Sequence, residues 1–226
     1  MSTIVALLRS PADGAARVLR EGRPSVALIL VGAATALSVL NTLRFASAVA
    51  VEEVMFGPGR SPAVGLLLGL LGREGTSVVL YLFQSSWPAL LTVGALAPVL
   101  VWLLGSTAVH AAARLSALRR PFLPVLVLFG YAVGITRPAA DLAALTGDPQ
   151  GPSAALTQLI ALGATVWLGL IAWHGIRAHY DLTGGRALTL LVVALVFFYL
   201  APITLILLAL VAILVAAVLL EYVPAP

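Results

Sequence analysis

The sequence predicts an all-α membrane protein, a polytopic bundle of transmembrane helices. Of its 226 residues, 61% are hydrophobic and only 10% are charged, too few charges to cover the surface of a soluble domain of this size. The mean hydropathy is +1.09. The run from Ala187 to Leu220 contains no charged residue, and as one helix it is longer than a bilayer core of about 30 Å requires. The chain is therefore expected to lie in a membrane.

Residues 1–23 are expected to form an amphipathic segment that lies along the headgroups on the cytoplasmic side. Apolar side chains recur there at helical spacing on both sides of Ser10-Pro11, with arginines opposite them. The apolar set is Ile4, Leu7, Leu8, Ala15, Val18 and Leu19, and the arginines are Arg17 and Arg20. The remainder, residues 24–222, is predicted to be the membrane domain.

Five apolar runs have about the 20 residues that a spanning helix needs. They are Pro24 to Leu43, Pro88 to Ala112, Phe122 to about Leu145, Ala154 to Ile176, and Ala187 to Leu220. In the last run, Pro202 is expected to bend the helix because it lacks an amide donor. Residues 62–86 form two shorter apolar stretches interrupted by Arg73-Glu74-Gly75. A re-entrant hairpin and two interfacial helices both remain possible for that segment.

The distribution of arginines predicts the orientation. Nine of them flank the predicted spans on one side, which the positive-inside rule makes cytoplasmic: Arg9, Arg17, Arg20, Arg23, Arg114, Arg119, Arg120, Arg177 and Arg186. The N-terminus is therefore expected inside and the C-terminus outside. All 13 basic residues are arginine, which together with the Ala, Val and Leu bias suggests a prokaryote with GC-rich DNA. The expected location is its cytoplasmic membrane.

Several classes of chemistry find no support in the sequence. The chain has no cysteine, which excludes disulfides, thiolate metal sites and cysteine nucleophiles. The net charge of +4 does not come with an aromatic-interleaved basic stripe, so nucleic acid is not an expected partner. No Gly-x-Ser-x-Gly turn and no phosphate-binding loop is present. The prediction is a protein that is not an enzyme and has no cofactor.

Two groups of polar residues are candidate sites. Arg137 and Asp141 are four residues apart and would share a helix face near the outer end of the third span. If Pro138 ends that span, Arg137 extends into the headgroups; a partner-binding or relay role is the alternative. The second group combines histidines near the cytoplasmic face with one carboxylate: His110, His174, His179 and Asp181. A zinc site, pH sensing and ordinary hydrogen bonding are the three interpretations, and the spacing matches no known metal motif.

Gly130 and Gly134 form a small-xxx-small pair in the third span, which lets helix backbones approach closely. Packing within the chain is the expected use, and self-association or docking of a partner is the alternative.

The order of these features resembles the Yip1 domain family of five-span membrane proteins. The resemblance rests on five short elements: Arg9-Ser10-Pro11, His110 to Leu115, Gly130-Tyr131-Ala132, the pattern Ile171 to Ile176 with Trp167, and Arg186-Ala187-Leu188. The chain departs from the family at Ser116-Ala117-Leu118, where a Gly-Gly pair is common, and at Pro138, which comes later than expected. A divergent prokaryotic member is the description that fits.

The resemblance implies a non-enzymatic protein that acts as an accessory or scaffolding partner of another membrane complex, such as an ABC-type exporter or trafficking machinery. The expected partners are the lipid bilayer and either another membrane protein or a second copy of the chain. Two alternatives stay open: a small transporter or channel, and a metal- or pH-responsive sensor that uses the histidines.

Overall fold

The computed structural model describes residues 3–48, 62–147, 154–200 and 203–204, and the described elements are all helices. They are α1 Thr3–Arg9, α2 Pro11–Glu21, α3 Pro24–Ala48, α5 Pro62–Ala95, α6 Ala97–Leu115, α7 Leu123–Thr146, α8 Ala154–Tyr180 and a helix of residues Gly184–Leu200. Five described segments are long and apolar enough to cross a membrane: Pro24–Ser47, Gly75–Ala95, Ala97–Leu115, Leu123–Thr146 and Ala155–Tyr180. The prediction of an all-α membrane bundle is confirmed.

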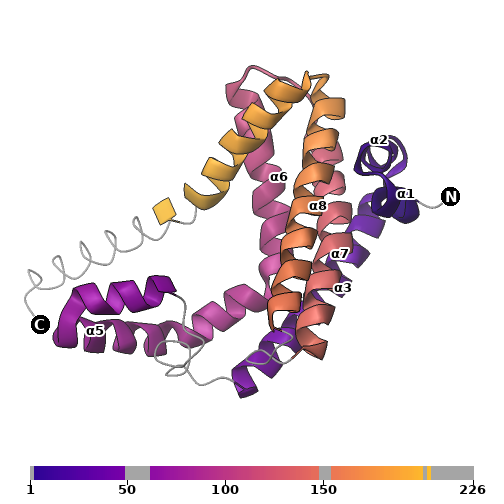
Figure 1. Cartoon of the computed structure of the whole chain (residues 1–226). Coiled ribbons are helices and arrows are strands. Elements are labelled where there is room, and N and C mark those ends of the chain that lie inside the picture. Colours follow the sequence, from indigo (N-terminus) through magenta and orange to yellow (C-terminus); the bar gives the residue numbers. More distant parts are fainter. Residues whose placement is uncertain (1–2, 49–61, 148–153, 201–202, 205–226) are drawn as a thin grey trace, which may run out of the picture.

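Helix α7 is the centre of the bundle and packs against α3, α6 and α8 (Figure 1). In its most apolar stretch of 18 residues, 61% of the residues are buried. The side chains that pack around α7 form two clusters. One joins α7 to α6, α8 and the helix Gly184–Leu200, and the other joins it to α3, α8 and the N-terminal helices.

The N-terminal helices α1 and α2 form a hairpin that packs on α7 and α8. Gly14 allows the close approach of the two helices, because a Cβ at this position would lie 2.4 Å from the Cα of Leu7. Leu7 and Val18 are buried, and the indole Nε1 of Trp167 donates to the carbonyl of Leu7 at 3.1 Å. Part of the apolar face therefore packs against protein, while Leu8 is 55% exposed. The predicted contact of this segment with the headgroups stays a prediction.

The predicted second span, Pro88 to Ala112, is divided at Leu96, where α5 ends and α6 begins. Pro98 has no amide hydrogen to donate to the carbonyl of Gly94, four residues earlier, so the helical hydrogen-bond ladder is interrupted here. The hydroxyl of Ser38 in α3 donates to that carbonyl at 3.0 Å. A side chain of a neighbouring helix thus supplies the donor that the proline removes.

Helix α5 reverses direction at Gly72, whose φ of 65° is left-handed and favours glycine. The result is a helical hairpin whose arms lie across the axes of α3, α7 and α8 (Figure 1). We call the second arm, Gly75–Ala95, the α5 arm. The segment for which the sequence left a re-entrant hairpin and two interfacial helices open is therefore helical on both sides of a tight turn.

The other predicted spans correspond to α3, α7, α8 and the start of the last run. Helix α3 extends to Ala48 and α8 to Tyr180, a few residues beyond the predicted ends. The helix Gly184–Leu200 begins slightly before the predicted span that starts at Ala187. The predicted bend at Pro202 lies outside the described residues.

Candidate polar site where helices α3 and α7 end

An ion pair lies inside α7. Helix α7 continues through Pro138 to Thr146. Pro138 therefore does not end the helix, which was one of the possibilities left open by the sequence. The Nε of Arg137 lies 3.2 Å from Oδ2 of Asp141, as the four-residue spacing predicts. Asp141 is only 2% exposed, and the side-chain amide of Asn41 in α3 donates to its other oxygen at 3.5 Å.

Arg137 lies well within its helix. Thr146 ends α7 nine residues later, which at about 1.5 Å per residue puts Arg137 about 14 Å from that end. Its side chain remains 41% exposed, while its partner Asp141 is enclosed. Ionisable side chains within apolar helices of spanning length commonly mark functional sites.

Arg44, at the end of α3, caps the C-terminus of α7. Its Nη1 donates to the carbonyls of Ala144, at 2.8 Å, and Leu145, and its Nη2 donates to the carbonyl of Gly147 at 2.9 Å. The last carbonyls of a helix have no partner within the helix, and a cation there also interacts favourably with the helix dipole. Arg44 therefore fixes the ends of α3 and α7 to each other.

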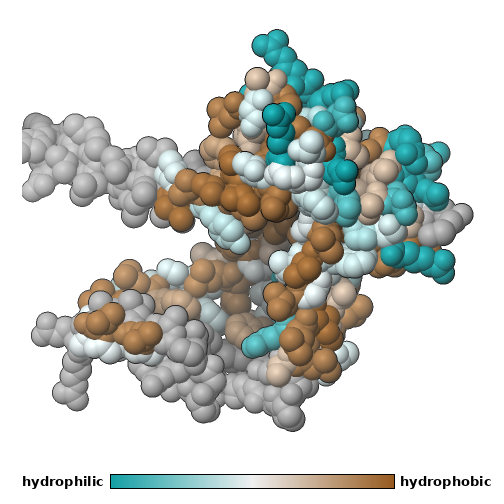
Figure 2. All heavy atoms as spheres, turned by 45° about the horizontal axis from the view of Figure 1, so that its top comes forward, coloured by the Kyte–Doolittle hydropathy of each residue, from teal (hydrophilic) through white to brown (hydrophobic). Residues whose placement is uncertain are grey.

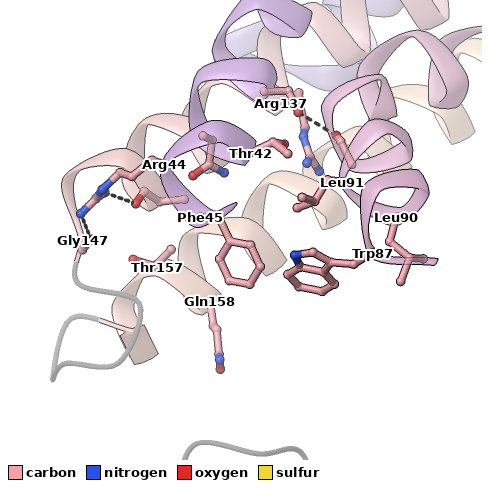
Figure 3. A pocket seen from close by; sticks show the side chains of 14 residues that line it. Thr42, Arg44, Phe45, Trp87, Leu90, Leu91, Arg137, Gly147, Thr157 and Gln158 are labelled. Carbon is pink, nitrogen blue, oxygen red and sulfur yellow. Dashed lines mark hydrogen bonds between the residues drawn. The ribbon is translucent and has the colours of Figure 1, made fainter. Parts of the chain in front are cut away.

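A polar pocket of about 420 Å³ lies beside this network, between α3, the α5 arm, α7 and α8 (Figure 3). Trp87 and Phe45 form one wall, with ring centroids 6.0 Å apart. The polar side chains that line it are Ser38, Asn41, Thr42, Arg44, Arg137, Thr157 and Gln158. Two guanidinium groups thus lie in a pocket with aromatic and uncharged polar walls.

A second, apolar cavity of about 370 Å³ lies between α6, α7, α8 and the helix Gly184–Leu200. Arg137 contributes to the lining of this cavity as well as to that of the polar pocket. No other charged side chain lines the apolar cavity among the described residues. Arg137 is therefore the charged residue that lines both cavities.

The histidines lie away from this site, and each of them makes a different contact. Arg114 donates through Nε to Nε2 of His110 at 3.3 Å, and Nε2 of His179 lies 3.0 Å from the carbonyl of Pro121. The ring of His174 lies next to that of Trp173, with centroids 4.6 Å apart and an angle of 56° between the ring planes. Among the described residues, His110, His174, His179 and Asp181 do not form a group of three or more that could hold a metal ion.

Gly130 and Gly134 lie where α7 touches α3. A Cβ on Gly130 would lie 2.7 Å from Cβ of Ala27, and one on Gly134 would lie 2.4 Å from Cβ of Leu30. Both distances are shorter than carbon atoms tolerate, so the two glycines allow the helices to pack within the chain. This is the first of the two uses that the sequence indicated.

Comparison of the chain with protein-family models, with curated proteins and with solved structures finds no match. The resemblance to the Yip1 domain family therefore rests on the short sequence elements alone.

The ion pair was predicted from the sequence, but the residues that surround it were not. Asn41 and Arg44 lie about 100 positions before their partners in α7, and nothing in their local spacing indicates those contacts. One signal was present: polar residues recur at helical spacing on one face near the end of an apolar helix, at Ser38, Asn41 and Arg44. Such a stripe indicates a face turned toward protein rather than lipid.

Proposed function

We propose that this chain is a non-enzymatic membrane scaffold that binds another integral membrane protein through the α5 arm. The observation that carries the proposal is the exposure of the arm: none of the residues in its most apolar 18-residue stretch is buried. Large apolar side chains remain exposed along it, among them Val78, Tyr81, Leu82, Leu90 and Val93.

The direction of the arm supports a partner. An arm of this length reaches about 30 Å, and it lies across the bundle axes rather than along them (Figure 1). Figure 2 shows the α5 region and the helix Gly184–Leu200 as two largely apolar projections separated by an open recess. In the prokaryotic cytoplasmic membrane expected from the arginines, the partner is another helical membrane protein.

A transporter or channel is the less favoured function, because the described bundle has no continuous polar path. The polar side chains that could line such a path are either hydrogen-bonded to other groups or far apart along the chain. Asn41 bonds to Asp141, Thr165 bonds to its own helix, and Gln158 lies at the polar pocket. The core around α7 is formed by apolar clusters.

Site-directed photocrosslinking in native membranes tests the scaffold. A photoreactive residue replaces Leu82 in the α5 arm, which is 55% exposed, and in a matched variant Leu162 of α8, which is 60% exposed. We expect Leu82 to give one discrete heteromeric protein adduct and Leu162 to give lipid adducts. A second substitution one turn away, Val78→Ser, should reduce the Leu82 adduct without changing the melting temperature of the purified protein.

Two outcomes would overturn the proposal. Lipid adducts alone at both positions would show that the arm is covered by the bilayer. An adduct of twice the mass of the chain would identify the partner as a second copy. The protein would then be a homo-oligomer and not a scaffold for another protein.

A further inference from the structure

We infer that Arg137 is the headgroup anchor of a binding site for an anionic phospholipid, whose acyl chain occupies the apolar cavity between α6, α7, α8 and the helix Gly184–Leu200. This inference does not rest on a protein partner of the α5 arm, although Trp87 and Leu90 of the arm line the polar end of the site.

At the polar end of the site, the described side chains include donors of Arg137 that bond to no described residue, and their net charge is positive. Among the described residues, the guanidinium of Arg137 is hydrogen-bonded only through Nε, to Asp141. Arg44 places both of its terminal nitrogens on carbonyls of the α7 end, so it contributes charge rather than free donors. Two guanidinium groups and one carboxylate give this end a charge of about +1 at neutral pH. An anionic group is the ligand that this charge favours.

Other groups at the pocket can bond to a headgroup. The side chain of Thr42 lies close to Arg137 in the polar pocket, and that of Gln158 lines the opposite side (Figure 3). The indole of Trp87 forms part of the wall, and Trp is typical of the boundary between hydrocarbon and headgroups. Polar donors beside an arginine between transmembrane helices are typical of lipid headgroup sites.

The apolar end is shaped for a hydrocarbon chain. The cavity walls carry aliphatic and aromatic side chains such as Val101, Phe129, Leu168 and Leu195. Glycine and alanine at several lining positions leave the space open, and a Cβ added to Gly169 would meet no described atom within 4 Å. An apolar cavity of this kind does not hold water well, and it binds apolar ligands instead.

The position of Arg137 in the lining of both cavities selects the ligand. A free phosphate would use only the polar end, and a neutral hydrocarbon would use only the apolar end. A ligand that uses both ends carries a negative headgroup and a long chain on one molecule. In a membrane protein, an anionic phospholipid meets that description and is at high local concentration.

The test measures binding of phosphatidylglycerol to the delipidated full chain in a mild detergent, by native mass spectrometry and by the rise in melting temperature. Phosphatidylcholine with the same acyl chains is the headgroup control, and inorganic phosphate is the chain-free control. We expect phosphatidylglycerol to bind at least about tenfold more tightly than phosphatidylcholine, since charge-assisted hydrogen bonds contribute that much.

Two variants test the two ends of the site. The double variant Arg137→Gln/Asp141→Asn removes the guanidinium donors of Arg137 without leaving Asp141 unpaired. Because Arg44 keeps the net charge of this end at about +1, the variant should reduce the preference for phosphatidylglycerol rather than abolish it. Gly169→Leu fills the apolar cavity and should weaken binding of both lipids about tenfold or more. Gly163→Leu is its control, because Gly163 lies on the same helix, its Cβ would also meet no described atom, and it does not line this cavity.

Three results would overturn the inference. The first is equal binding of the two lipids to the unmodified chain. The second is an unchanged preference in the Arg137→Gln/Asp141→Asn variant. The third is stabilisation by inorganic phosphate equal to that by phosphatidylglycerol, with no effect of Gly169→Leu, because the apolar cavity would then have no part in binding.

Discussion

Helix α7 and the α5 arm are two apolar helices of spanning length that differ in almost every contact they make. In their most apolar stretches, 61% of the residues of α7 are buried and none of those of the arm. Hydropathy therefore does not decide which helix becomes the core. The difference lies in the residues that allow or require neighbours: α7 has glycines against α3 and a buried carboxylate, and the arm has exposed aliphatic side chains.

The largest expected effect comes from filling the contact between α7 and α3. Gly134→Leu should destabilise the protein by about 3 kcal/mol, because its Cβ would lie 2.4 Å from Cβ of Leu30 and 2.9 Å from the Leu30 carbonyl carbon. The matched change in α5 is Gly69→Leu, where a Cβ would meet no described atom within 4 Å. That variant should gain up to about 1 kcal/mol from helix propensity.

Thermal unfolding in one mild detergent, followed by circular dichroism, measures both variants. Similar losses of stability in the two would mean that α5 is as closely packed as α7 in the folded protein, and the contrast between the helices would be lost.

A smaller effect is expected from the ion pair inside α7. Asp141→Ala leaves Arg137 and the amide of Asn41 without their acceptor. Breaking a fully buried pair costs about 3–5 kcal/mol, and because the side chain of Arg137 is 41% exposed we expect about 2 kcal/mol. Asp141→Asn retains an acceptor oxygen and should cost about half as much.

A double-mutant cycle with Arg137→Gln separates the pair from its surroundings. We expect a coupling energy of about 1 kcal/mol between the two positions from unfolding in detergent. Additive effects of the two single changes would show that Asp141 is stabilised by α3 alone.

The sequence predicted those parts of the architecture that depend on patterns of residues close together along the chain. Apolar runs of spanning length indicated α3, α7 and α8, and the four-residue spacing indicated the pair Arg137–Asp141. Contacts between distant segments have no such local pattern, so Arg44 at the end of α7 was not foreseen. The same holds for the packing of the N-terminal hairpin on the bundle, because an amphipathic helix fits a protein groove or a membrane surface equally well.

Pro98 explains why the predicted span Pro88 to Ala112 is divided at Leu96. A run of apolar residues through Leu96 has the composition of one helix, and the sequence pattern alone does not show how the missing donor of Pro98 will be replaced. The replacement comes from Ser38, a residue of another helix.

The smallest expected effect concerns this junction, where the α5 arm is attached to the bundle. Ser38→Ala removes the donor to the carbonyl of Gly94, and Ser38 is only 2% exposed. The loss should be about 1 kcal/mol for an unsatisfied carbonyl. The more informative change is in the arm: without this bond, its direction relative to α3 should vary more widely.

Distances between spin labels at Leu28 on α3 and Leu82 on the arm, both exposed, measure that variation by pulsed electron resonance. We expect a broader distance distribution in Ser38→Ala than in Ser47→Ala, because among the described residues the hydroxyl of Ser47 bonds to the carbonyl of Arg44 within its own helix. Equal distributions in the two variants would mean that the direction of the arm is set by α5 and α6 themselves. In that case the hydroxyl of Ser38 would stabilise the junction without orienting the arm, and the contrast between a fixed core helix and a tethered arm would have to be traced to the backbone at Leu96.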